Sequence, residues 1–222
     1  MPIIKTDKKL ILYCHIPKCG GTTVTNYLRS AGYPIGFVNT SFKREKTKWS
    51  KTSPQHIDMK SLETLNIMNL IDESFAVVRH PTERFVSAFQ YNKKNGQIPF
   101  WMTLNQFLKR LGNANDKWHF KLDNHFRPMS QFVNDETHIV KLEAGDHAII
   151  SLLNKITETK TQLDPLDHAN SKQEIPVKKT FSRAYFKRLT TVNNFSELTK
   201  SQNNLIFKIY KEDFERFQYR VS

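Results

Sequence analysis

A short loop with two glycines, residues 17–21 in the sequence PKCGG, joins an apolar run directly to a helical pattern. The run Leu10–Ile16 is largely apolar, which is typical of a buried parallel strand. Beyond the loop, Thr22–Tyr33 has apolar side chains at helical spacing until Gly32 ends the pattern. A strand that leads through so short a loop into a helix indicates an α/β fold.

The alternation of strands and helices continues along the chain. Further strands are predicted at residues 74–80 and Thr137–Glu143, and helices at Ser61–Ile71, Thr82–Lys94, Asp146–Ile156 and residues 196–217. The polar, proline-containing stretch Thr157–Lys179 is predicted to be a loop or lid. We therefore predict a single domain over residues 1–222, an α/β, P-loop-like three-layer fold with a mainly parallel central sheet flanked by helices.

The charge balance favours an anionic partner. The chain has 34 lysines and arginines against 21 aspartates and glutamates, a net charge of +13, which attracts anions of any kind. No apolar run reaches the length of about 18 residues needed to span a bilayer, so we expect no membrane insertion. Cys14 and Cys19 lie so close together in sequence that a disulfide is not expected, which favours a reducing, cytoplasmic location.

The glycine loop has the chemistry of an anion site. Gly20 and Gly21 let backbone amides turn inward, and the start of the following helix adds the positive end of its dipole. Thr22 and Thr23 bring hydroxyl donors, and Lys18 brings a mobile charge. A Walker loop has its lysine after the last glycine, whereas here the lysine comes first, which argues against ATP or GTP hydrolysis. The alternative is an ordinary turn that holds no ligand.

The loop also carries a family resemblance. After a strand, PKCGGTT resembles the 5′-phosphosulfate loop of sulfotransferases that use 3′-phosphoadenosine 5′-phosphosulfate (PAPS). The longer HIPKCGGTT is similar to the carbohydrate branch, which includes heparan sulfate 2-O- and chondroitin 4-O-sulfotransferases. The resemblance implies a metal-free site in which the phosphosulfate is held by Lys18, Cys19, Gly20, Gly21, Thr22 and Thr23. A cysteine at a helix start can also be a nucleophile, but we interpret Cys19 as a small loop residue.

A second motif, VVRHPTERFVSAF, covers Val77–Phe89. From the residues alone, Arg84 and Ser87 share a helix face and suit a phosphate clamp, unless Arg84 pairs with Glu83 or another surface carboxylate. The spacing Arg-x-Pro-x-x-Arg-x-x-Ser is similar to the 3′-phosphate motif of the same family. The resemblance assigns Arg79 and Ser87 to the 3′-phosphate and leaves Arg84 to support the helix.

Three more segments extend the resemblance over most of the chain. They are SPQHI at residues 53–57, DNHFRPMSQFV at residues 123–133 and IYKEDFERFQY at residues 209–219. Met129 departs from the family pattern, in which a glutamine is usual, and this weakens any acceptor contact inferred at that position.

Sulfuryl transfer to an alcohol needs a base for the acceptor proton and a cation for the charge that grows on the leaving oxygen. We assign the second task to Lys18, and a neutral histidine suits the first. The resemblance places an active-site histidine at His56, and His125 is the alternative, better suited to binding the acceptor. A glutamate serves as base in some relatives. Of the remaining histidines, His15 ends a strand, His80 points away from Arg79, His168 lies in the predicted lid, and His119, His138 and His147 have no motif around them.

The sequence thus predicts a PAPS-dependent O-sulfotransferase that leaves 3′-phosphoadenosine 5′-phosphate (PAP) and acts on a carbohydrate or anionic polysaccharide. The alternatives are a kinase or NTPase with a degenerate loop, and a non-enzymatic polyanion-binding protein. We expect no nucleic-acid partner, because the lysines are spread along the chain. The basic-aromatic stretches at residues 43–51 and 178–188 suit an acceptor surface. A bacterial, cytoplasmic enzyme is expected, or a Golgi-lumenal one if the chain is part of an anchored protein.

Overall fold

The structure, a computed structural model, describes residues 1–39, 41–43, 46, 50–158 and 198–221. Most of the predicted loop or lid lies outside these residues, and so does His168. The basic-aromatic stretch at residues 178–188 is also outside, together with part of the stretch at residues 43–51.

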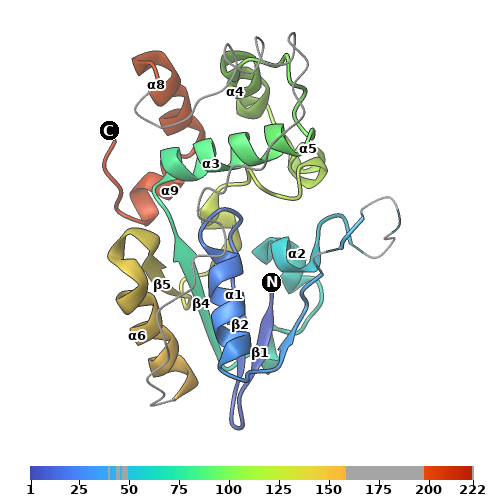
Figure 1. Ribbon diagram of the computed structural model, residues 1–222, viewed down its shortest axis with the longest axis vertical. Helices are drawn as coiled ribbons and strands as arrows, with labels where there is room; N and C mark the ends of the chain where they lie inside the picture. Colours follow the sequence, from blue (N-terminus) through green and yellow to red (C-terminus); the bar gives the residue numbers. More distant parts are fainter. Residues whose placement is uncertain (40, 44–45, 47–49, 159–197, 222) are drawn as a thin grey trace.

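A five-stranded sheet forms the centre of the fold, with strand order β3-β1-β2-β4-β5 (Figure 1). The strands are β1 Ile3–Lys5, β2 Leu10–Tyr13, β3 Ile35–Gly36, β4 Glu73–Val78 and β5 His138–Lys141. β2, β4 and β5 run parallel, but β1 is antiparallel to both β2 and β3. The sheet is therefore mixed, and the prediction of a mainly parallel sheet is right only for β2, β4 and β5. The tight turn at residues 6–9 forces β1 and β2 into a hairpin, which is antiparallel by geometry.

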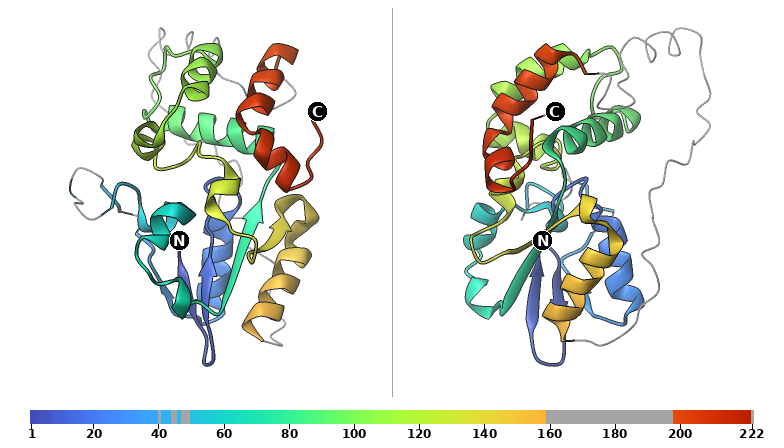
Figure 2. Two further views of the ribbon diagram at one scale, coloured as in Figure 1. Left: turned by 180° about the vertical axis from the view of Figure 1, so that it is seen from behind. Right: turned by 90° about the vertical axis from the view of Figure 1, so that its left-hand side faces the viewer.

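Helices cover both faces of the sheet. Helices α1 (Gly21–Ser30) and α6 (Gly145–Thr157) lie on one face, where their apolar side chains pack with those of β2 and β4. The short helix α2 (Met59–Glu63) lies on the opposite face and packs with the 3-10 turn Met129–Phe132. Figure 2 shows the two layers on either side of the sheet.

A helical lobe stands beyond the end of β4. It comprises α3 (Pro81–Lys94), α4 (Leu104–Gly112), α5 (Asp116–Lys121), α8 (Lys200–Ile209) and α9 (Lys211–Arg216) (Figure 1). Its core is rich in aromatic side chains, with Phe85, Phe89, Phe107, Phe126 and Tyr210 all buried. Identical capping boxes, Thr103 with Gln106 and Thr199 with Gln202, begin α4 and α8. The lobe lies beyond the carboxyl ends of β2 and β4 (Figure 1).

Two predicted helices are interrupted in the structure. The helix predicted at Ser61–Ile71 begins earlier, at Met59, where Asp58 accepts a hydrogen bond from the Ser61 amide. It ends at Glu63, because Asn66 takes a left-handed conformation with φ 51°, and a 3-10 turn follows at Met68–Leu70. The predicted C-terminal helix is divided into α8 and α9 at Tyr210.

Arg84 is one of the largest fully buried side chains among the described residues. Its Nε donates to the carbonyl oxygen of Pro17 at 3.1 Å, and its Nη2 donates to those of His125 at 3.3 Å and Arg127 at 2.8 Å. The carboxylate of Glu83 contacts Arg79 instead, with Nη2 to Oε2 at 3.0 Å. Arg84 is therefore neither a surface ion-pair partner nor a phosphate ligand, and it ties two distant segments together.

Replacing Arg84 by methionine should lower the free energy of unfolding by about 3 kcal/mol or more, because three buried carbonyl groups lose their donor. Urea denaturation measures the loss. The control is Arg79→Met, which breaks a partly exposed ion pair and should cost within about 1 kcal/mol. Equal losses in the two variants would contradict the structural role given to Arg84.

Candidate active site

The glycine loop leads from β2 into α1 and presents unused donors. Gly20 is left-handed with φ 77°, and α1 begins at Gly21 without a side-chain cap. In the part of the chain that the structure describes, the amides of Gly21, Thr22 and Thr23 donate no hydrogen bond. Three free amides at a helix start, with the dipole behind them, form a ready site for an anion.

Each glycine of the loop is required for a different reason. Gly20 has the positive φ that side chains rarely adopt. A Cβ at Gly21 would lie 1.8 Å from Nε2 of His15, so the imidazole occupies the space where a side chain would stand. The predicted need for both glycines is thereby explained, and His15 is packed directly against the loop.

Cys19 points away from the anion site. Its side chain is fully buried, with Sγ 3.8 Å from Sδ of Met129. Burial raises the pKa of the Cys19 thiol to about 12, so the thiolate is not available near neutral pH. Cys19 is therefore a packing residue, and Met129, which is also fully buried, supports the loop from behind.

Lys18 carries the charge of the loop. Its Nζ lies 4.1 Å from the centre of the Tyr91 ring, a cation–π contact that holds it at the carboxyl edge of the sheet. Burial, together with the smaller effect of the nearby charge of Arg79, lowers the pKa of Lys18 to about 8. No carboxylate pairs with Lys18 in the described ranges. A bound anion would meet a desolvated, unpaired cation.

Of the two predicted 3′-phosphate residues, Arg79 lies at the same end of the sheet as Lys18, since it follows β4 as Lys18 follows the parallel strand β2. Arg79 follows β4 and forms its ion pair with Glu83 one helical turn on, and Ser87 is half-buried on α3. No hydrogen bond joins Arg79 to Ser87 within the described residues. The structure thus brings Arg79 near Lys18 but leaves it shared with Glu83.

Three histidines from distant parts of the sequence meet beside the loop. The ring of His56 lies 5.1 Å from that of His15 and 5.3 Å from that of His125, measured between centroids. Tyr91, the aromatic partner of Lys18, contacts His125 at 5.1 Å. A continuous chain of rings therefore joins Lys18 to His56.

His56 is held by a carboxylate. Its Nδ1 lies 2.7 Å from Oδ2 of Asp123, and the amide and hydroxyl of Ser53 donate to the same carboxylate at 2.6 and 2.7 Å. Burial opposes ionisation of Asp123, but the electrostatic attraction of His56 and these hydrogen bonds outweigh it and lower the pKa of Asp123 to about 2. An ionised Asp123 fixes the proton of His56 on Nδ1, so that Nε2 is left bare as a base.

Asp123 has the role that sequence reasoning missed. The prediction weighed a glutamate as an alternative base but gave no function to Asp123, although it stands two residues before His125. That Asp-x-His spacing was the available signal. The pairing with His56 depends on a contact across 67 residues of sequence, which no local pattern contains.

The other described histidines lie on or next to different elements of the fold. Nε2 of His80 lies 3.1 Å from the Arg220 carbonyl oxygen, and His138 lies 2.9 Å from the carboxylate of Glu73. His119 is half-buried on α5, and His147 is exposed on α6. That none of these four belongs to the site stays a prediction.

The same cluster has the spacing of a metal site. Ligand atoms of His56, Asp123 and His125 lie within 4.8 Å of one another. The carboxylate of Asp123 already accepts the bonds from Ser53 and His56, and Nδ1 of His125 already contacts Asn92 at 2.9 Å. An ion at this place would have to displace that network, and metal-free catalysis stays a prediction.

The family is decided by comparison of the whole chain. The sequence profile of the sulfotransferase family matches residues 1–220. The chain belongs to the sulfotransferase family. No curated protein and no solved structure gives a significant match. Membership supports an enzyme that transfers a sulfuryl group from a donor to an acceptor.

In this sulfotransferase Tyr210 and Asp213, near the C-terminus, form hydrogen bonds with the segment that follows His125. The carboxylate of Asp213, fully buried, accepts from the amides of Met129 and Ser130 at 2.8 Å each. The hydroxyl of Tyr210 donates to the Phe126 carbonyl oxygen at 3.0 Å. The segment that carries Asp123 and His125 is therefore fixed by residues nearly at the end of the chain.

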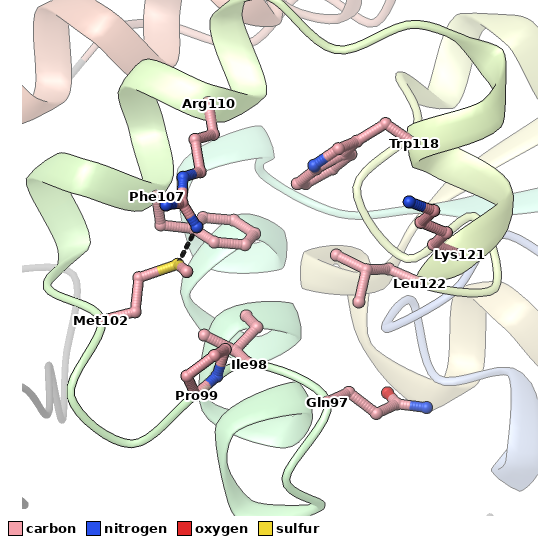
Figure 3. A pocket seen from close by; sticks show the side chains of 9 residues that line it. All are labelled: Gln97, Ile98, Pro99, Met102, Phe107, Arg110, Trp118, Lys121 and Leu122. Atoms are coloured by element: carbon pink, nitrogen blue, oxygen red, sulfur yellow. Dashed lines mark hydrogen bonds between the residues drawn. The ribbon is translucent and has the colours of Figure 1, made fainter.

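A pocket of about 390 Å³ opens in the helical lobe of the sulfotransferase (Figure 3). One residue of its lining, Leu122, directly precedes Asp123 in the sequence. Its apolar wall includes Phe107 and Trp118, which face it from α4 and α5. Arg110 and Lys121 also line it, and neither forms an ion pair in the portion of the chain described. Aromatic faces with unpaired cations suit a ligand that has both apolar surface and negative charge.

None of the helices in the described residues is both long enough and apolar enough to cross a bilayer.

Proposed function

We propose that this sulfotransferase moves the sulfuryl group of PAPS to a hydroxyl of a carbohydrate acceptor by in-line displacement. The observation that carries the proposal is the contact of 2.7 Å between Nδ1 of His56 and an ionised Asp123, beside the loop of Lys18. A base held in one tautomer, next to an anion site, meets the needs of sulfuryl transfer to an alcohol. A passive polyanion binder does not require this pair, and the position of Lys18 before the glycines argues against a kinase.

The residues of the glycine loop fit the donor. The free amides of Gly21, Thr22 and Thr23, with Lys18, would hold the phosphosulfate end. Arg79 and Ser87 would hold the 3′-phosphate, and Arg79 would then share its charge between that phosphate and Glu83. Bound PAPS supplies a sulfuryl group attached to a good leaving group, and PAP remains after transfer. Sulfotransferases generally use this donor.

The chain's own residues would carry two tasks during transfer. Nε2 of His56 takes the proton of the acceptor hydroxyl while the acceptor oxygen bonds to sulfur and the bond from sulfur to the phosphate oxygen breaks. Lys18 stabilises the charge that grows on that phosphate oxygen. Asp123 keeps its carboxylate and stabilises the imidazolium as it forms.

We propose that the acceptor is an anionic polysaccharide and that the pocket of Arg110 and Lys121 binds one of its acidic sugar units. Sugar rings have apolar faces that stack on aromatic side chains such as Trp118, and the two cations complement an acidic group. We further propose that residues 1–222 act as a single domain, since the family match runs from 1 to 220. The free, buried thiols of Cys14 and Cys19 support a reducing compartment such as the cytoplasm.

PAP should stabilise the protein without added metal, and ATP with Mg²⁺ should stabilise it much less, because the two phosphate sites match a 3′,5′-bisphosphate. At about 100 times its dissociation constant, PAP should add about 2.7 kcal/mol, or roughly 5–10 °C in melting temperature. Thermal-shift measurement decides between donors. Greater stabilisation by ATP with Mg²⁺ would restore the kinase alternative.

The same ligand provides a pH test. Lys18 has a pKa of about 8, so it is charged below that pH and favours the bound anion there. PAP affinity should therefore fall above pH 8, by up to about tenfold per pH unit, and Lys18→Met should bind weakly at every pH without this fall.

His56→Ala should bind PAP normally yet lose on the order of 10²–10⁴-fold in turnover, the usual contribution of a general base. Asp123→Asn should lose turnover in the same sense, because Nδ1 no longer faces a negative charge. The matched control is His138→Gln, which removes a histidine that contacts the Glu73 carboxylate elsewhere and should keep full activity. Near-normal turnover in His56→Ala would remove His56 as the base.

The double variant Arg110→Gln, Lys121→Gln should raise the Michaelis constant for an acidic polysaccharide about tenfold at low salt, because two cations that face the acceptor are lost. The constant for a neutral polysaccharide should not change. Lys109→Gln, on the same helix but outside the pocket, is the control. If the effect per removed charge is the same in the double variant and in Lys109→Gln, net charge, and not the pocket, binds the acceptor.

A further inference from the structure

Asn92 is a fully buried amide on α3 that contacts the histidine cluster. Its Nδ2 lies 2.7 Å from the carbonyl oxygen of Ala88 and 2.9 Å from Nδ1 of His125. A carbonyl oxygen can only accept a hydrogen bond, so the group beside Ala88 must be the NH₂ of Asn92 and not its oxygen. This contact fixes the orientation of the amide.

The fixed amide determines the tautomer of His125. Because the NH₂ of Asn92 donates toward it, Nδ1 of His125 must accept, and a neutral imidazole then carries its proton on Nε2. Burial, together with the smaller effect of the neighbouring His56, lowers the pKa of His125 to about 3, so the ring is neutral near pH 7. His125 is therefore a donor at Nε2, whereas His56 is an acceptor there.

Nε2 of His125 is free to meet a ligand. It forms no hydrogen bond with the residues that the structure describes, and it is not one of their fully buried unpaired atoms. The ring contacts Tyr91 on one side and His56 on the other, at 5.1 and 5.3 Å. The bare Nε2 of His56 and the Nε2–H of His125 thus belong to adjacent rings.

We propose that His125 donates a hydrogen bond from Nε2–H to the oxygen of the acceptor hydroxyl, and that Asn92 is the positioning residue that fixes this tautomer. The proposal rests on the function proposed above. A hydroxyl group has one proton to give to His56 and lone pairs to receive the bond from His125, so it can satisfy both rings at once. In this tautomer His125 has no free lone pair and cannot act as a second base.

The tautomer can be measured without donor or acceptor, so its failure would be distinct from failure of the proposed function. Two-bond ¹H–¹⁵N correlation spectra of protein with ¹⁵N-labelled histidine give the protonation of each ring nitrogen. The His125 signals are those missing from His125→Gln. We expect a neutral ring protonated at Nε2 at pH 7 and still at pH 5. A proton at Nδ1, or an imidazolium at pH 7, would overturn the proposal.

Kinetics of two His125 variants test the donor. His125→Gln places an amide NH₂ near the position of Nε2–H and should keep the acceptor Michaelis constant within about threefold of the wild type. His125→Ala should raise that constant about tenfold, as expected for one lost hydrogen bond, with a smaller effect on turnover. Equal effects of glutamine and alanine would refute the donor role. The control is His147→Gln, at an exposed position on α6, which should leave the acceptor Michaelis constant unchanged.

Asn92→Asp tests the positioning. A carboxylate can only accept, so the proton of His125 should move to Nδ1, and the acceptor Michaelis constant should rise as it does in His125→Ala. PAP binding should stay within about twofold, which shows that the fold is intact. Asn92→Leu, which removes both hydrogen bonds without adding charge, serves if the aspartate variant does not fold. A moved proton with an unchanged acceptor constant would overturn the role of Asn92.

Discussion

The buried guanidinium of Arg84 is the interaction on which the arrangement of the site depends. It joins the carbonyl of Pro17, the first residue of the anion loop, to the carbonyls of His125 and Arg127, more than a hundred residues away. An ion inside a protein is costly unless every donor finds an acceptor, so the surrounding backbone has little freedom to move. The same cation thus sets the distance between the loop that would hold the donor and the segment that would receive the acceptor.

Helix α3 contributes side chains that contact both the anion loop and the histidine cluster. Arg84 points from it into the interior, while Tyr91 and Asn92, near its end, contact Lys18 and His125. Since these side chains project from one rigid helix, their relative positions change little when a ligand binds. The irregular segments that carry His56 and Asp123 are then fixed to it through His125 and Arg84.

The cationic side chains of the site and its neutral histidine rings lie in different places. Lys18 and Arg79 give the loop side a positive field, whereas burial lowers the pKa of both His15 and His125 and keeps these rings neutral. Asp123, with a pKa of about 2, is the ionised carboxylate in contact with His56. Under the proposed function, an anionic donor and a neutral hydroxyl would therefore meet different environments at neighbouring places in the site.

The sequence by itself determined the elements and the anion loop. A strand, two glycines and a helix start follow from local backbone preferences, and the apolar periods predicted β2, β4, β5, α3 and α6. Sequence reasoning did not find the short hairpin of β1 and β2 or the left-handed break at Asn66, although both are local features. The pairing of β3 with β1 and the burial of Arg84 depend on contacts with residues far away in the sequence, which a local pattern cannot reveal. The pairing of His56 with Asp123 and of Asn92 with His125 was decided by tertiary structure alone, since hydrogen bonds across 67 and 33 residues form only when the sheet and the helical lobe meet.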